Sequence, residues 1–523
     1  MNLKFPIRIA TAVILVLVTL ILLQGARDSA RRRGMPGLSG TSSTGRWFDP
    51  YARYNNGTHD YYALTFVVSL DGFHPNLISS EATPFLHSLF SLHRGNTTVC
   101  PYMIPCFPSQ TFPNHWSMVT GQEPGDHGIV SNFFYDSELA AEFSPGDKDP
   151  RIWAHSSTPV WADLQRAYES GSYRVAAHMW PGCEVIYDAD HSREPAEATA
   201  FNGTETLREK AARLLAYLDT DKIEERPQLV LGYAPQVDAY GHGKTYPAPH
   251  TESFQTLLQQ VDLFVEALFD GLEQRNLQNF TNVLVVSDHG MATVPAENVI
   301  LWSELVTDRV NSLADHVYLE GPALALYPKK GALEEVRSAL HELLAAHPLG
   351  SRFTLSGPYK ADRQRIAPVW VMPEVHYAVA HNRTLMGTHG YNNTAAEMRG
   401  IFLASGPAFA KRYVAPLHNF ELQQLLLQLG GVASGFTFSE LGADFSDNFD
   451  VLRDSFGNGS TYNAVFNNET LPLDDVVQNP QELGDHPAPP YDSVSGLLDN
   501  LLEELEQLAE WGSGPHGRDV AVI

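Results

Sequence analysis

Short, continuous apolar runs alternate with longer segments of helical periodicity along most of the chain. The runs end in turn residues, and a strand formed by such a run would have no polar face. This is typical of strands buried on both sides in a parallel sheet. Four of them cover residues 64–70, 228–233, 283–287 and 400–404. Between the runs, residues 252–272 and 333–345 carry apolar positions at helical spacing. The pattern predicts an α/β fold with a mostly parallel central sheet and helices on both faces.

Both ends of the chain depart from this alternation. Within residues 1–24, an apolar run from Ile9 to Leu23 lies between basic residues, which favours a signal anchor or a cleaved signal peptide. Residues 25–60, rich in Gly, Ser, Arg and Asn, predict a stem before the main domain of residues 61–437. Residues 438–523 form an acidic tail, and its last part shows the pattern of an amphipathic helix over 493–511.

Glycosylation signals support a secretory route for the protein. Sequons of the form N-x-S/T occur at Asn56, Asn96, Asn202, Asn279, Asn382, Asn392, Asn458 and Asn468. Together with the N-terminal run, they predict a single-pass type II membrane protein with a lumenal or extracellular main domain, or a protein secreted after cleavage. The N-terminal segment is the only membrane contact expected.

Charge and cysteine content narrow the range of functions. The formal net charge of -26 argues against binding of polymeric nucleic acid, which needs a basic face. Small anionic substrates remain compatible with this charge, because bound metal ions would dominate the local field. The 3 cysteines are too few for a disulfide framework. The spacing allows Cys100 and Cys106 to close a short loop, which would leave Cys183 unpaired.

Aspartate and histidine residues follow the predicted strands at their carboxyl ends, where open α/β sheets place their sites. They are Asp71 after the first run, Asp238 and His242 after the second, Asp288 and His289 after the third, and His389 in a later Gly-rich turn. Taken singly, such residues are often helix caps, surface pairs or loop residues. Their joint occurrence after three successive strands predicts a metal centre. Three Asp and three His suit two zinc ions with three protein ligands each.

Several short motifs accompany these residues. The segment Thr111-Phe112-Pro113-Asn114-His115 is followed by Thr120-Gly121 and His127-Gly128-Ile129. The remaining motifs are Asp71-Gly72-Phe73, Trp180-Pro181-Gly182, Asp238-x-x-Gly241-His242-Gly243, Ser287-Asp288-His289-Gly290-Met291 and Gly387-x-His389-Gly390. In combination they closely resemble the nucleotide pyrophosphatase/phosphodiesterase family of the alkaline phosphatase superfamily, over residues 63–410.

The resemblance implies an alkaline-phosphatase-like fold and a zinc phosphodiesterase catalytic domain over residues 61–437. It also implies how the ligands divide between two zinc ions. One ion is held by Asp238, His242 and His389, and the other by Asp71, Asp288 and His289, with the hydroxyl of Thr111 bound to the second ion.

Thr111 is the expected nucleophile. A threonine hydroxyl is a weak nucleophile by itself, and metal coordination activates it. In-line attack on phosphorus gives a threonyl-phosphate intermediate, which water then hydrolyses. By the same resemblance, Asn132 hydrogen-bonds a phosphoryl oxygen. Without the metal-binding residues, Thr111 would be interpreted as a turn hydroxyl and Asn132 as part of an Asx-turn.

Two neighbouring activities fit the sequence less well. The segment Cys106-Phe107-Pro108-Ser109-Gln110 is similar to the sulfatase motif C-x-P-x-R, but Gln110 stands in place of the arginine. Alkaline phosphatases use a serine nucleophile and an arginine for the phosphate. Thr111 and Asn132 therefore favour diesters and pyrophosphates over monoesters.

The expected substrates are nucleotides, or nucleotide-like phosphodiesters and pyrophosphates, cleaved to nucleoside 5′-monophosphates. Phe112 and Phe201 match positions at which relatives stack the base, although core packing is the more ordinary role for Phe201. Phe133 replaces a lysine that some animal relatives place near distal phosphates, which argues against a tight grip on a triphosphate tail. Two alternatives are a phospholipid-headgroup or choline-type phosphodiesterase, and a glycoprotein with a non-catalytic binding domain. The latter is disfavoured because Thr111 and every metal ligand are present.

Overall fold

The computed structural model describes residues 49–153, 157–168, 172–187, 193–243, 251–360, 364–433 and 435–439. The predicted N-terminal anchor, most of the stem and nearly all of the acidic tail, including its amphipathic helix, lie outside these residues. Among the helices within the described ranges, none is long and apolar enough to span a membrane.

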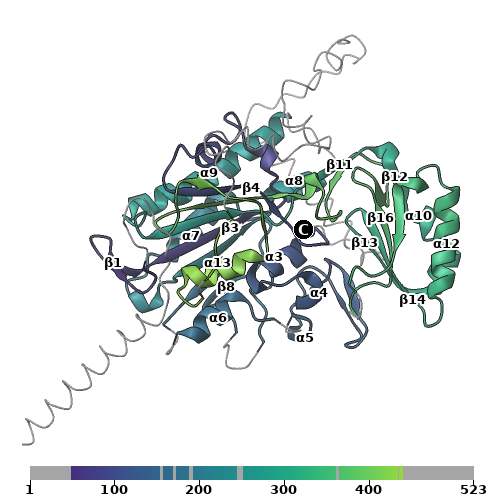
Figure 1. The fold of residues 1–523 in the computed structure, drawn as a ribbon, viewed down its shortest axis with the longest axis horizontal. Helices are drawn as coiled ribbons and strands as arrows, with labels where there is room; N and C mark the ends of the chain where they lie inside the picture. The colour runs from purple at the N-terminus through teal and green to yellow at the C-terminus, as the bar shows by residue number, and fades with distance from the viewer. Residues whose placement is uncertain are drawn as a thin grey trace, which may run out of the picture.

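A nine-stranded sheet forms the centre of the molecule (Figure 1). Its order is β20 (Arg412–Tyr413), β4 (Thr97–Ile104), β19 (Gly400–Ser405), β10 (Thr281–Val286), β3 (Leu64–Leu70), β9 (Leu229–Ala234), β7 (Val175–His178) and β8 (Glu197–Thr199), with β21 (Leu417–His418) also paired to β4. The four strands predicted from the apolar runs are β3, β9, β10 and β19, and they lie side by side with β3 between β9 and β10.

Strand direction follows the prediction at the centre of the sheet and departs from it at one strand. β3 is parallel to both neighbours, so that Phe66 pairs with Val230 on one side and with Val283 on the other. β19 runs antiparallel to β10 and to β4. A strand buried on both faces is apolar whichever way it runs, and the pattern therefore predicted β19 but not its direction.

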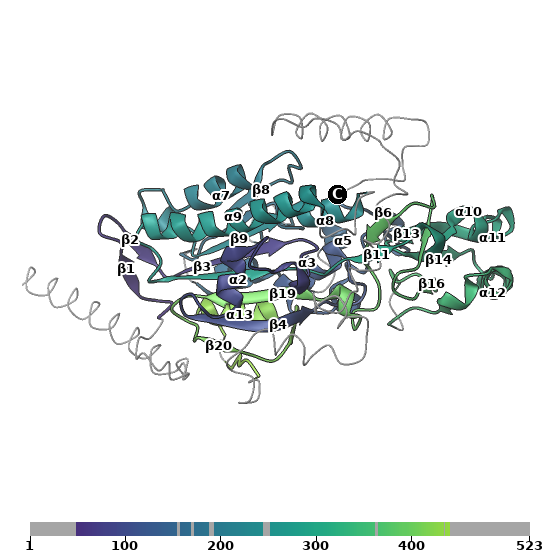
Figure 2. The same ribbon diagram turned by 90° about the horizontal axis from the view of Figure 1, so that it is seen from above.

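Helices cover both faces of the sheet (Figures 1 and 2). One face carries α2 (Pro84–Phe90), α7 (Leu207–Ala216) and α9 (Glu252–Gln274), and the other carries α3 (Thr111–Thr120), α6 (Val160–Ala167) and α13 (Glu421–Leu429). Successive β3 side chains point to opposite faces: Val67 enters the α3 side, while Phe66 and Val68 enter the α9 side. The mostly parallel α/β architecture expected from the sequence is thereby confirmed.

A smaller α/β unit is inserted between β10 and β19, at the right of Figure 1. Its sheet has the order β13 (Ala314–Glu320), β14 (Ala323–Pro328), β16 (Val369–Pro373) and β15 (Phe353–Ser356), covered by α10 (Trp302–Leu305), α11 (Asp308–Leu313) and α12 (Leu333–Ala346). Leu326, Leu340 and Val371 belong to its separate core. The periodicity predicted α12 but did not separate this unit from the main domain.

Short elements complete the described chain. The strand pairs are β1 (Arg53–Asn55) with β2 (Asp60–Tyr62), β5 (Phe134–Asp136) with β6 (Ala141–Phe143), β11 (Ala292–Val294) with β18 (Met386–Thr388), and β12 (Val299–Leu301) with β17 (Ala378–Ala380). The short helices are α4 (Pro124–His127), α5 (Pro150–Trp153) and α8 (Gln236–His242).

The three cysteines are buried and unpaired, so the Cys100–Cys106 disulfide that the spacing allowed is absent. Cys100 lies within strand β4 and Cys106 lies beyond its end. An extended segment of this length spans about 20 Å, far more than a disulfide bridges. The Cys106 thiol instead lies 3.2 Å from the side-chain oxygen of Asn419.

Candidate active site

The predicted metal-binding residues converge at the carboxyl ends of the central strands. Asp71 directly follows β3, Asp238 and His242 lie on α8 behind β9, and Asp288 and His289 follow β10. His389 comes directly after β18, which pairs with β11 beyond the site. Parallel strands bring their carboxyl ends to one edge of the sheet, which explains why residues so distant in sequence meet there.

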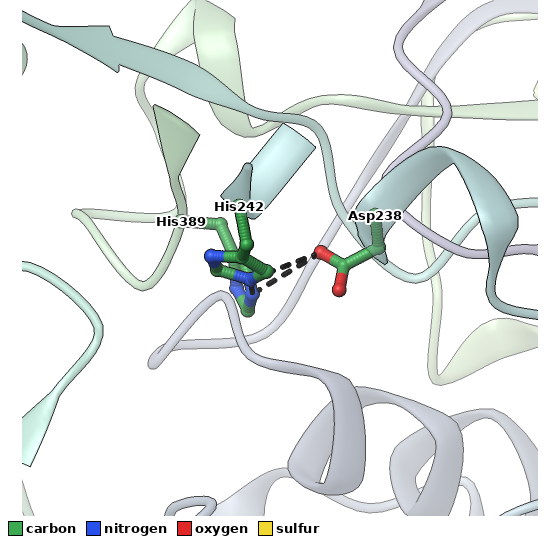
Figure 3. A group of neighbouring side chains, drawn as sticks. All are labelled: Asp238, His242 and His389. Carbon is green, nitrogen blue, oxygen red and sulfur yellow. Dashed lines mark hydrogen bonds and ion pairs between the residues drawn. The ribbon is translucent and has the colours of Figure 1, made fainter. Parts of the chain in front are cut away.

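Asp238, His242 and His389 form the first ligand group (Figure 3). Asp238 Oδ1 lies 3.4 Å from His242 Nε2 and 3.3 Å from His389 Nε2, and the two nitrogens are 3.0 Å apart. Nδ1 of His389 donates to the carbonyl of Ser109 at 2.9 Å, which turns Nε2 toward the group. Four-residue spacing on α8 places Asp238 and His242 on one helical face.

A second ligand group adjoins the first. Asp71, Asp238 and His289 bring one ligand atom each within 4.8 Å of one another. Nε2 of His289 lies 3.4 Å from Asp71 Oδ1 and 3.2 Å from Asp288 Oδ2. The His289 and His389 rings stack with centroids 3.7 Å apart, so the two groups are neighbours. The expected Asp71, Asp288 and His289 therefore lie together, and Asp238 belongs to both groups.

Three carboxylate oxygens in this cluster are buried without a hydrogen-bond donor: Asp71 Oδ1, Asp238 Oδ1 and Asp288 Oδ2. The second oxygens of two of them are bonded, since Asp71 Oδ2 accepts from Tyr233 and Asp288 Oδ1 accepts from the amide of Gly72. Burial of an unpaired carboxylate oxygen is costly unless a cation compensates it. The arrangement fits divalent cations held between these oxygens and the histidine nitrogens.

The charges of the cluster influence one another strongly. Burial and the nearby Asp288 raise the pKa of Asp71 well above its usual range. Burial alone would also raise the pKa of Asp288, but His289 and His115 hold it below its usual value. Burial lowers the pKa of His389 to about 3, which leaves this imidazole neutral and able to offer a lone pair.

Thr111 occupies the first position of helix α3 and faces the second ligand group. Its hydroxyl lies 3.3 Å from Nε2 of His289, and the residue is buried. Gln110 precedes it in extended conformation, and the helix ends at Gly121 in the left-handed conformation. The hydroxyl therefore lies at a helix N-terminus, where the backbone dipole favours an anionic group.

Asn132 approaches Thr111 from the loop after α4. Its side-chain oxygen accepts from the amide of Phe112 at 3.0 Å. This bond orients the side-chain amide and leaves its nitrogen available as a donor. Asn132 is half-buried.

The two candidate base-stacking rings differ in exposure. Phe112 is buried and packs at ring-centroid distances of 5.9 Å from Phe143 and 6.2 Å from Trp153. Phe201 is 44% exposed and lies 6.4 Å from the ring of Tyr233, whose hydroxyl bonds Asp71. Core packing, the ordinary role considered for Phe201, is excluded by this exposure, whereas Phe112 packs mainly against other aromatics.

Comparison with known proteins identifies the family. The family described as "Type I phosphodiesterase / nucleotide pyrophosphatase" matches residues 65–392. The chain belongs to this family. The match spans the six aspartate and histidine residues of the cluster together with Thr111 and Asn132, and the resemblance inferred from the motifs is confirmed.

Two relatives from Saccharomyces cerevisiae are named ectonucleotide pyrophosphatase/phosphodiesterase 1 and 2. They are 38% and 39% identical to the chain, over 80% and 72% of its length and over 65% and 83% of theirs. Among solved structures, human ectonucleotide pyrophosphatase/phosphodiesterase 5 is 26% identical with a TM-score of 0.61, and the match covers 72% of this chain and 97% of that one. Its mouse counterpart gives 27% identity and a TM-score of 0.60 over the same shares.

Two further side chains support the cluster and were assigned no role from the sequence. His115, in the next turn of α3, bonds the carbonyl of Thr111 and the hydroxyl of Ser69 at 2.9 Å each. Its Nδ1 also lies 3.4 Å from Asp288 Oδ2. Tyr233, near the end of β9, bonds Asp71. His115 stands within the quoted motif and Tyr233 at a strand end, but only the folded chain shows what they contact.

Proposed function

We propose that the protein is a zinc-dependent nucleotide pyrophosphatase/phosphodiesterase that releases nucleoside 5′-monophosphates through a threonyl-phosphate intermediate. The observation that carries this proposal is the position of Thr111. Its hydroxyl lies at the first position of α3, 3.3 Å from His289 and beside buried carboxylate oxygens without donors. Family membership supports the same chemistry.

We assign the metal ligands as the sequence predicted. Asp238, His242 and His389 would hold one zinc ion, and Asp71, Asp288 and His289 the other. A mixed set of imidazole nitrogens and carboxylate oxygens favours zinc. When bound, the two ions supply charge stabilisation for the attacking and leaving oxygens of a phosphoryl transfer and favour ionisation of a hydroxyl at neutral pH.

The reaction then proceeds through two successive displacements at phosphorus. In the first, Thr111 Oγ1 forms a bond to phosphorus while the bond from phosphorus to the leaving oxygen breaks. In the second, water attacks phosphorus and the bond to Thr111 breaks, which frees the nucleoside monophosphate. The N-terminus of α3 and the side-chain nitrogen of Asn132 stabilise the negative charge on the other phosphoryl oxygens in both steps.

Nucleotides are the substrates that the family supports best. The solved structure of a mouse relative is described as an inactive threonine-to-alanine variant in complex with AMP. In this chain the exposed ring of Phe201 is suited to stack a base beside the cluster, and Phe112 would line the inner wall. The headgroup alternative has no comparable support, and the non-catalytic alternative conflicts with the retention of Thr111 and all six ligands.

We further propose that the catalytic domain, residues 61–437, acts in the secretory pathway or outside the cell, behind a membrane anchor or after cleavage. The N-terminal run and the sequons support this location, and Asn96, Asn202, Asn279, Asn382 and Asn392 are exposed. N-glycosidase treatment of the protein from eukaryotic cells should increase its mobility on denaturing gels. An unchanged mobility would argue for a cytosolic protein.

The decisive experiment compares a phosphodiester and a phosphomonoester that release the same chromophore. The zinc-loaded protein should cleave a chromogenic nucleotide 5′-phosphodiester and leave the matching phosphomonoester nearly intact. Thr111→Ala should abolish the diesterase activity, while Thr256→Ala on the outer side of α9 should retain it. Dominant monoesterase activity, or full diesterase activity in Thr111→Ala, would contradict the proposal.

A further inference from the structure

A buried hydrogen-bonded ring joins the inserted α/β unit to both loops that carry the reaction. Its members are Gln110, directly before Thr111, Ser131, directly before Asn132, and Glu320, the last residue of edge strand β13. Each is about 1% exposed. In Figure 1, β13 lies on the side of the inserted sheet nearest α3 and α4.

The contacts within the ring are close. Gln110 Nε2 donates to Glu320 Oε2 at 3.0 Å, and Ser131 Oγ lies 2.8 Å from Gln110 Oε1. Ser131 Oγ is also hydrogen-bonded to Glu320 Oε2. The amide of Asn132 donates to Gln110 Oε1 at 2.9 Å. This last bond fixes which end of the Gln110 amide is oxygen, because an N–H group cannot donate to the nitrogen end.

Counting hydrogens shows that the ring needs one more proton than an ionised glutamate provides. Ser131 has a single hydroxyl hydrogen and contacts two oxygens, Gln110 Oε1 and Glu320 Oε2. Gln110 Oε1 carries no hydrogen, so the Ser131 hydrogen must lie on that contact. Glu320 must then supply the hydrogen for its own contact with Ser131.

We infer that Glu320 is held as a protonated carboxylic acid and serves as a positioning residue for Thr111 and Asn132. In the closed ring, Glu320 donates to Ser131, Ser131 donates to Gln110, and Gln110 donates back to Glu320. Burial supports this state, since it raises the pKa of Glu320 to about 8. The positioning role rests on the function proposed above for Thr111.

The ring fixes the positions of the two loops relative to each other at the site. Gln110 is the N-terminal flanking residue of α3, so its orientation sets where the helix begins and where Thr111 lies. The backbone of Asn132 is tied to the Gln110 side chain, and its side chain is tied to the amide of Phe112. A disturbance of the ring therefore moves the nucleophile relative to the phosphoryl-binding amide.

The substitution Glu320→Gln tests this directly, because it preserves shape and neutrality but not the bonding pattern. One oxygen of a carboxylic acid both donates and accepts, whereas an amide nitrogen only donates and an amide oxygen only accepts. In either amide orientation, one contact of the ring pairs two donors or two acceptors. We expect kcat for the nucleotide diester to fall on the order of tenfold or more, with KM changed less than about twofold and zinc content equal to wild type.

Ser131→Ala provides a compensating variant. Without the serine, residue 320 no longer needs to donate, and an amide oxygen there simply accepts from Gln110. The double variant Glu320→Gln/Ser131→Ala should therefore have a higher kcat than Glu320→Gln alone, a coupling that independent sites do not show. The control is Glu342→Gln on α12, which removes a solvent-exposed ion pair with Arg309 and should behave as wild type.

An infrared difference spectrum between zinc-loaded wild type and Glu320→Gln supplies a readout that does not depend on turnover. A carbonyl band of a protonated carboxylic acid should be present at neutral pH in the wild type and lost in the variant.

Wild-type kcat in Glu320→Gln, or absence of that band, would overturn the inference. Should Glu320→Gln fail to fold, Ser131→Ala alone should lower kcat, and an unchanged kcat would overturn it equally. A wild-type enzyme that shows the band but cleaves no diester would instead overturn the proposed function, and the positioning role with it.

Discussion

Asp238 is the residue on which both halves of the site depend. Its Oδ1 atom faces His242 and His389, and the same residue belongs to the group that contains Asp71 and His289. In the proposed mechanism, a carboxylate in this position would hold two cations close together, which suits in-line displacement at phosphorus. Asn132 is tied to the N-terminal turn of α3 through the amide of Phe112, and in the proposed mechanism it stabilises charge on a phosphoryl oxygen.

Substitution of Asn132 by alanine should lower kcat on the order of 100-fold, because one donor to the phosphoryl oxygens is lost. Steady-state kinetics on a nucleotide 5′-diester measures this loss. Asn311→Ala, at an exposed position of α11, is the matched control. An Asn132→Ala enzyme with wild-type kcat would assign the residue a purely local role in the turn.

At the scale of elements, the strands predicted from apolar runs indicated where the site lies. Because β3, β9 and β10 are parallel neighbours, the residues after them meet as the sequence predicted. His389 was harder to place, since it reaches the cluster through the β11–β18 pair, and short strands of three residues leave little periodicity to detect. The direction of β19 depended on partners that only the folded sheet defines.

The hairpin between β13 and β14 presses against the backbone of His389. At Gly321 the backbone φ is +60°, and a β-carbon there would lie 2.0 Å from the His389 carbonyl oxygen. Gly321→Ala should therefore displace His389, lower the affinity for zinc and reduce kcat. Gly331→Ala is the control, because φ is +84° but no atom lies within 4 Å, so that only the backbone cost of about 1 kcal/mol remains. Zinc titration and kinetics of both variants measure the difference, and equal behaviour would contradict it.

The segment between β8 and α7 presents Phe201 to solvent beside Tyr233. Phe201→Ala should raise KM for a nucleotide diester by roughly 5- to 150-fold, which corresponds to about 1–3 kcal/mol of base stacking. A small diester without a base should show unchanged kinetics. Leu263→Ala, which removes another exposed apolar side chain, serves as control. An equal effect on both substrates would exclude a stacking role.

At the scale of the whole molecule, two units meet at the site. The main sheet supplies the aspartates, and the inserted unit supplies Glu320 and the hairpin that rests on His389. The motifs predicted which aspartates and histidines lie together beside Thr111, since motifs depend on residue types and spacing. The inserted unit was not predicted as separate, because its strands and α12 repeat the same alternation as the main domain.

Removal of metal should affect both activity and stability. Ions bound at the buried cluster stabilise the folded state by mass action, and their removal leaves several carboxylates without a compensating charge. Chelator should abolish diesterase activity and lower the melting temperature, and added zinc should restore both. Calorimetry with parallel activity assays measures the two effects. Full activity after exhaustive dialysis against chelator would contradict a metal-dependent mechanism.

The stereochemistry at phosphorus tests the central claim most directly. A nucleotide 5′-diester made chiral at phosphorus with sulfur can be hydrolysed by the enzyme in isotopically labelled water. Two in-line displacements, first by Thr111 and then by water, each invert the configuration, so the account predicts overall retention. Inversion would show that water attacks the substrate in a single step and would contradict the threonyl intermediate.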